Sequence, residues 1–152
     1  MHFSPTERRN VNVNEADVVL DTSAIFCLIR DEPGADLVEA ALDDGRAAKA
    51  VIAISFASLT EVFYNTLRLA DRTRARELIG RIKSWPVDLV YPNEALCLAA
   101  GEIKALFSLS FADAFIAATA RETKAVLVHK DPEFESLGAA IKQKPLPYKR
   151  QR

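Results

Sequence analysis

The chain has 152 residues, of which 49% are hydrophobic and 27% are charged, a composition that excludes a disordered chain and fits one globular domain. Twenty Lys and Arg residues against 21 Asp and Glu residues give a formal net charge of −1, so the average charge argues neither for nor against a nucleic-acid partner. No apolar run reaches the roughly 20 residues that span a membrane, and the N-terminal residues lack the apolar core of a signal peptide, so we expect a cytoplasmic protein with no membrane partner.

Short apolar segments are predicted as strands, and helical patterns fill the gaps between them. In chain order, the strands are expected at 17–20, 51–54, 87–90, 125–128 and 139–141. The helices are expected at 22–30, 34–44, 56–70, 73–84, 94–106 and 112–123, with the second helix ending at Gly45. Because strands that alternate with helices form parallel sheets with right-handed crossovers, the sequence predicts an α/β protein.

These elements are expected to form one domain, residues 17–144, between a loosely ordered N-terminal arm, 1–16, and a basic C-terminal tail, 145–152. Basic residues are concentrated between residues 68 and 83 and from residue 142 to the end of the sequence. Each stretch is either ordinary solvated surface or a surface that contacts phosphates. Cys27 and Cys97 lie in apolar helical segments without metal or disulfide spacing, which predicts buried, reduced thiols.

Four acidic residues lie in apolar surroundings: Asp21, Glu61, Asp113 and Asp131. Taken alone, each has an ordinary explanation. Asp21 and Asp113 could cap helices, and Asp131 precedes Pro132 in a turn. Glu61 could lie on the exposed edge of its helix.

Taken together, the four acids predict a metal site. Ligands of open parallel sheets bind beyond the carboxyl ends of the strands, where the strand order reverses, and all four acids could converge there. Carboxylates that share such a cleft repel one another unless a cation is present. Hard divalent cations such as Mg²⁺ prefer oxygen ligands of this kind.

Four sequence motifs resemble the PIN-domain family, and within it the VapC-type ribonuclease toxins of toxin–antitoxin pairs. The motifs are LDTSAI at 20–25, LTEV at 59–62, FADAFIAATA at 111–120 and LVHKDPEF at 127–134. They occur in the family's order, and the resemblance runs from about residue 17 to residue 141. It implies a three-layer α/β/α fold with a parallel five-stranded sheet of order 3-2-1-4-5.

The resemblance also implies an activity, namely Mg²⁺- or Mn²⁺-dependent endonucleolytic cleavage of RNA by activated water. It assigns catalysis and metal binding to Asp21, Glu61, Asp113 and Asp131. Thr22 and Ser23 resemble the hydroxyl positions that support the first acid, and of the two Ser23 is expected to orient this acid or a bound water. The implied partners are an RNA substrate, an antitoxin protein whose basic side chain could enter the acidic cleft, and a second copy of the chain in a homodimer.

One position departs from the family pattern, because His129 stands where VapC-like chains usually have Thr or Ser. The imidazole could ligate metal, contact phosphate or simply be tolerated. Glu133 could supply a fifth, outer acid, but an exposed turn position is the expectation. Arg30 and the basic stretch 68–83 are candidates for holding the RNA backbone.

Other functions fit the sequence less well. A dehalogenase-type phosphatase needs an Asp where Ser23 stands, and a receiver domain needs paired acids near the first strand. No phosphate-binding glycine motif occurs. The alternative that stays open is a non-catalytic PIN-like module that binds RNA or protein.

Overall fold

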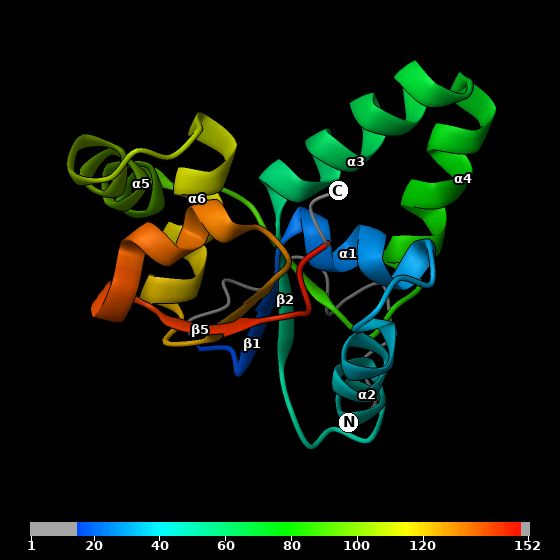
Figure 1. Ribbon diagram of the computed structural model, residues 1–152, viewed down its shortest axis with the longest axis horizontal. Helices are drawn as coiled ribbons and strands as arrows, with labels where there is room; N and C mark the ends of the chain where they lie inside the picture. Colours follow the sequence, from blue (N-terminus) through cyan, green and yellow to red (C-terminus); the bar gives the residue numbers. More distant parts are fainter. Residues whose placement is uncertain (1–14, 150–152) are drawn as a thin grey trace.

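The computed structural model describes residues 15–149, which fold around a five-stranded parallel sheet (Figure 1). The strand order is β3-β2-β1-β4-β5, as predicted. Every neighbouring pair of strands runs parallel. The strands are β1 (Val18–Leu20), β2 (Ile52–Ser55), β3 (Asp88–Val90), β4 (Val126–His129) and β5 (Lys142–Pro145).

The fifth strand is the one that the sequence misplaced. Residues 139 and 140 close the 3-10 segment η2 (Pro132–Ala140), and the strand itself begins at Lys142. The residues of β5 are KQKP, and most of them are exposed because the strand lies at the edge of the sheet and pairs only with β4. An edge strand does not need the apolar composition that reveals a strand covered on both faces.

Helices cover both faces of the sheet and complete the predicted α/β/α layers (Figure 1). Helices α5 and α6 pack with η2 against one face, where Val19, Ala53 and Leu127 are buried. On the other face, α1, α2, α3 and α4 enclose Leu20, Ile54 and their neighbours. The helices are α1 (Thr22–Ile29), α2 (Ala35–Arg46), α3 (Phe56–Leu69), α4 (Arg72–Lys83), α5 (Glu94–Leu106) and α6 (Phe111–Glu122).

The structure differs from the sequence analysis at two helix ends. Helix α2 does not stop at Gly45 but continues to Arg46. Gly45 lies at a close packing contact, since a Cβ there would be 3.1 Å from the Pro86 carbonyl oxygen. Asp113 does not cap α6 either. The cap is Ser110, whose hydroxyl accepts a hydrogen bond from the Asp113 N–H at 3.1 Å.

The two cysteines differ, since Cys27 is buried as expected but Cys97 is exposed on α5. Among residues 15–149, no single helix is long and apolar enough to span a membrane. The pair α5 and α6 passes that test only jointly, and it is bent by 116°.

The chain beyond β5 packs onto the domain. Leu146 is 2% exposed, and its N–H donates to the His129 carbonyl at 2.7 Å. Further along, Tyr148 and Lys149 contact Glu135 and Glu32. Residues 145–149 therefore belong structurally to the domain, whereas 150–152 and most of the predicted N-terminal arm lie outside the described residues.

Candidate metal centre

The sheet topology brings the four predicted acids to one edge of the sheet. Strands β1 and β4 are neighbours in register, so their carboxyl ends coincide. Asp21 follows β1 directly, and Asp131 lies two residues beyond β4. Asp113 in the first turn of α6 and Glu61 on α3 lie near the same edge. The charge of Asp113 raises the pKa of Asp21, and the charge of Glu61 raises the pKa of Asp113.

Asp21 is the most buried of these acids, with 2% of its surface exposed. It caps α1 by accepting the Ala24 N–H at 2.8 Å, and the Ser23 hydroxyl reaches its two oxygens at 2.7 and 2.8 Å. Burial raises the pKa of Asp21 from 3.8 to about 7, against the lowering effect of these hydrogen bonds. The negative charge of Asp113 contributes to this raised pKa, so the two carboxyl groups interact electrostatically.

Ser23 lies where the resemblance implies, and it also connects the two strand ends. Its hydroxyl donates to Asp21 and accepts the Lys130 N–H at 2.7 Å. One side chain therefore links the acid after β1 to the turn that carries Asp131.

Thr22, whose hydroxyl was also expected to support the first acid, hydrogen-bonds to Glu61 instead. Thr22 Oγ1 donates to Glu61 Oε1 at 2.7 Å and lies 3.1 Å from Ser58 Oγ. The Tyr64 hydroxyl lies 3.4 Å from the other oxygen of Glu61. Glu61 is half-buried and faces inward instead of lying on the exposed edge of α3.

Asp113 lies at the electrostatic centre of the site. Burial, and after it the charges of Glu61, Asp131 and Glu133, raise its pKa to about 6 against the lowering effect of the Ser110 hydrogen bond. Like charges this close favour a bound cation.

Glu133 belongs to the acidic group together with Asp113 and Asp131. One ligand oxygen from each of these three residues lies within 4.8 Å of the others. Glu133 is exposed, as expected of a turn residue, and its N–H donates to Asp131 at 3.0 Å. The sequence raised Glu133 only as an outer acid, because spacing alone does not show where its side chain points. Asp21 and Glu61 lie outside this compact group of three.

His129 is not one of the candidate ligands that lie together, and both of its ring nitrogens have other partners. Its ring is fully buried, Nδ1 accepts the Asp131 N–H at 3.2 Å, and Nε2 lies 3.0 Å from Gln143 Oε1. Since Nδ1 accepts, the proton is on Nε2 and is donated to Gln143; burial lowers the pKa of His129 and favours this neutral form. With both nitrogens engaged, His129 supports the turn that carries Asp131.

The donor set fits a hard divalent cation. All the candidate ligand atoms are carboxylate oxygens, the type that Mg²⁺ and Mn²⁺ prefer. The raised pKa values of Asp21 and Asp113 show how strongly the free site disfavours uncompensated negative charge.

The PIN-domain family profile matches residues 18–140. No curated protein matches the sequence significantly. Among solved structures, VapBC2 from Rickettsia felis bound to promoter DNA superposes with a TM-score of 0.69 at 15% identity, over 86% of this chain and 98% of that chain. VapBC-1 from nontypeable Haemophilus influenzae superposes with a TM-score of 0.63 at 21% identity, over 84% of this chain and 96% of that chain.

A third similar structure is VapC20 from Mycobacterium tuberculosis, described as a toxin that cleaves the sarcin–ricin loop. Its TM-score is 0.62 at 19% identity, over 80% of this chain and 95% of that chain. At these identities the likeness shows the fold, and the fold agrees with the family profile. The chain therefore belongs to the PIN-domain family.

Proposed function

We propose that the protein is a Mg²⁺- or Mn²⁺-dependent endoribonuclease and the toxin of a VapBC-type toxin–antitoxin pair. The observation that carries this proposal is the convergence of acids at the carboxyl ends of β1 and β4. Asp113 interacts electrostatically with the acids around it. The structural likeness to a toxin that cleaves the sarcin–ricin loop supports the same proposal.

In this proposal Asp21, Asp113 and Asp131 hold the cation, with Glu61 as a further ligand or as a partner through water, and Glu133 at the outer rim. A bound divalent cation would supply a nucleophile at neutral pH and would stabilise charge on the reacting phosphodiester. Ser23 fixes the orientation of Asp21, and Thr22 fixes that of Glu61.

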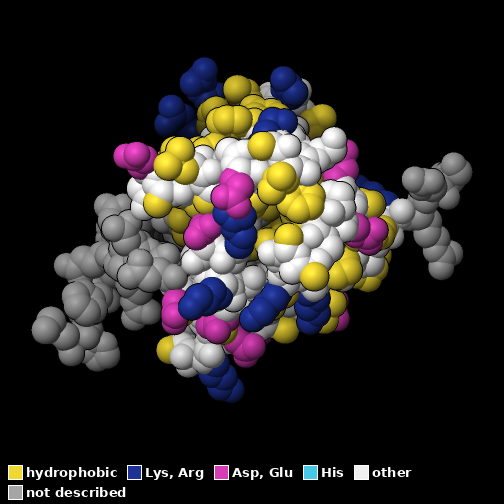
Figure 2. Space-filling view, turned by 90° about the vertical axis from the view of Figure 1, so that its left-hand side faces the viewer, with side chains coloured by type: hydrophobic (Ala, Val, Ile, Leu, Met, Phe, Trp, Pro, Cys, Tyr) yellow, Lys and Arg dark blue, Asp and Glu magenta, His cyan; other side chains and the backbone are white. Residues whose placement is uncertain are grey.

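The proposed partner protein is an antitoxin, since several similar structures are VapBC complexes. A homodimer and a cytoplasmic location stay predictions from the sequence. The face shown in Figure 2 mixes hydrophobic and charged side chains. Large apolar side chains are exposed on α5 and at the start of α6, and these could serve a dimer contact: Leu98, Leu106 and Phe111.

The direct test is cleavage of single-stranded and structured RNA by the purified toxin, free of antitoxin, with Mg²⁺, Mn²⁺ or a chelator. We expect cleavage only with metal, and a loss of at least about 100-fold in Asp21→Asn and Asp113→Asn because each removes a ligand charge. Asp44→Asn, on the exposed surface of α2, is the matched control. Unchanged cleavage in both site variants would overturn the proposal, and RNA binding without any cleavage would favour the non-catalytic module.

A further inference from the structure

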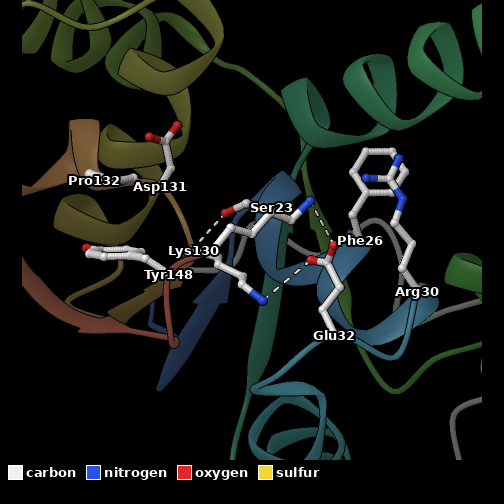
Figure 3. Close-up of a pocket in the computed structure, with 9 residues that line it drawn as sticks. Ser23, Phe26, Arg30, Glu32, Lys130, Asp131, Pro132 and Tyr148 are labelled. Carbon is white, nitrogen blue, oxygen red and sulfur yellow. Dashed lines mark hydrogen bonds and ion pairs between the residues drawn. The ribbon is translucent and has the colours of Figure 1, made fainter. Parts of the chain in front are cut away.

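We infer that a cavity beside the acidic site binds one unpaired nucleotide of the RNA, next to the phosphate that is cleaved. The inference rests on the proposed function for its substrate class. The cavity has a volume of about 340 Å³ and shares Ser23 and Asp131 with the acidic site. Its other walls come from α1, the α1–α2 loop, the turn between β4 and η2, and the C-terminal segment (Figure 3): Phe26, Arg30, Glu32, Lys130, Pro132, Tyr148 and Lys149.

One wall offers a flat surface on which a base can stack. The Arg30 guanidinium lies over the Phe26 ring, 4.2 Å from its centroid, and Arg30 itself is exposed. Unpaired RNA bases stack on aromatic rings and on guanidinium planes of this kind.

The facing wall carries the Tyr148 ring (Figure 3). The Tyr148 hydroxyl donates to Glu135 at 2.7 Å, and the ring stacks near His129 at a centroid distance of 6.4 Å. These contacts fix the orientation of the ring before any ligand arrives. An aromatic side chain held in place loses little entropy when a base packs against it.

The C-terminal segment that carries Tyr148 is held in place by Leu146 and Pro147, which pack against Gly34 at the start of α2. The buried Leu146 lies so close to α2 that a Cβ at Gly34 would approach Leu146 Cβ to 3.2 Å and Pro147 Cδ to 3.1 Å. Tyr148 and Lys149 therefore have defined positions at the cavity.

The charges of the cavity fit a phosphate. Lys130 is almost buried, with 4% of its side chain exposed, and it forms the floor by donating to the Pro33 carbonyl at 2.9 Å and pairing with Glu32 at 3.6 Å. Lys149 reaches Glu32 at 3.0 Å but stays 71% exposed, so its ammonium group is available to solvent and to a backbone phosphate. With Arg30, three cations face two acids, Glu32 and Asp131.

This charge pattern favours a nucleotide over an antitoxin side chain as the occupant of the cavity. An antitoxin residue that compensates the acids would be basic and would enter the acidic site. The adjoining cavity is cationic and aromatic, which matches a nucleotide with its negative phosphate and its π-face.

The test uses single-stranded oligouridine with one 2-aminopurine, moved along the RNA one position at a time. The full-length protein carries Asp113→Asn so that the RNA stays intact, and fluorescence reports both affinity and base stacking. We expect quenching at one or two positions. Adding Tyr148→Ala should abolish the quenching and weaken binding about 10-fold. Tyr148→Phe, which keeps the ring, should preserve the quenching.

Arg30→Ala and Lys149→Ala test the phosphate contacts and replace exposed side chains, so they serve even if Tyr148→Ala does not fold. Each should weaken binding a few-fold and reduce the slope of log affinity against log salt by about 0.7 per lost contact. Lys144→Ala, an exposed lysine of β5 outside the cavity, is the matched control.

An abasic substitution at the quenched position separates ligand contact from a structural effect. It should weaken binding to the protein with intact Tyr148 but add little loss to Tyr148→Ala. Unchanged affinity and quenching in all three cavity variants would overturn the inference. The inference would also be overturned if the cavity variants bound RNA normally but co-purified less of the antitoxin, because that result would assign the cavity to the antitoxin.

The binding readout does not depend on cleavage. An inactive wild-type protein with intact quenching would remove the nuclease proposal and leave the cavity assignment. Active wild-type protein with no quenching would remove only the cavity assignment.

Discussion

At the scale of single residues, the buried carboxylate of Asp21 lowers the stability of the metal-free protein when it is ionised. Its pKa is about 7 in the folded protein against 3.8 as a free side chain, so the folded state binds the proton more tightly than the unfolded state does. The stability of the metal-free protein therefore falls as the pH rises from about 4 to about 7, and the whole penalty is present above pH 7.

Asp21→Asn should remove this penalty. The amide oxygen can still accept the Ala24 N–H, and no charge is buried. In the presence of a chelator, the variant's advantage in free energy of unfolding should grow by roughly 2 kcal/mol between pH 5 and pH 8. Chemical denaturation at several pH values measures this difference. An advantage that stays constant with pH would show that Asp21 is not the responsible group.

The residue scale also shows what sequence could predict of the site. The motifs around Asp21 and Asp113 place a charge in apolar surroundings, and that contrast is visible in the sequence. The link from Thr22 to Glu61 and the position of the Glu133 carboxylate beside Asp113 and Asp131 depend on side-chain directions in three dimensions, which no spacing encodes.

At the scale of elements, a buried hydrogen-bonded chain joins β4 to β5 and to the turn that carries Asp131. His129 connects the Asp131 N–H to Gln143, whose amide nitrogen donates to the Gly138 carbonyl at 3.2 Å. The ring also packs 5.1 Å from Phe134. The departure from the usual Thr or Ser thus has a structural role.

We expect His129→Leu to lower the free energy of unfolding by about 2 kcal/mol, because it leaves the Asp131 N–H and the Gln143 amide without their partner. Gln143→Ala should cost less. Because the two residues share one hydrogen bond, the double variant should lose less than the sum of the single losses. Additive losses in urea denaturation would contradict this coupling.

The strands that are buried on both faces could be predicted from the sequence, because burial requires apolar residues. Strands β1 to β4 are mostly apolar, and all were expected within about one residue of their observed positions. The edge strand β5 and the segment after it were missed, because exposed polar residues in an edge strand resemble a tail. That segment carries Tyr148, so the cavity could not be predicted from the sequence.

At the scale of the whole molecule, the strand order 3-2-1-4-5 creates the site. It makes β1 and β4 neighbours, and helices on both faces bring Glu61 and Asp113 to their carboxyl ends. The result is an acidic centre beside a cationic, aromatic cavity (Figure 3). This pairing suits a cation at the reacting phosphate and a neighbouring nucleotide held in place.

The most direct test of the metal site is Mn²⁺ titration by calorimetry, with wild-type protein, Asp113→Asn and the surface control Asp44→Asn. Wild type and control should bind Mn²⁺ at or below millimolar concentration, and Asp113→Asn should bind at least about 10-fold more weakly because the central carboxylate is lost. Absence of Mn²⁺ binding to the wild type at millimolar levels, or equal affinity in all three proteins, would contradict a metal centre built on these acids.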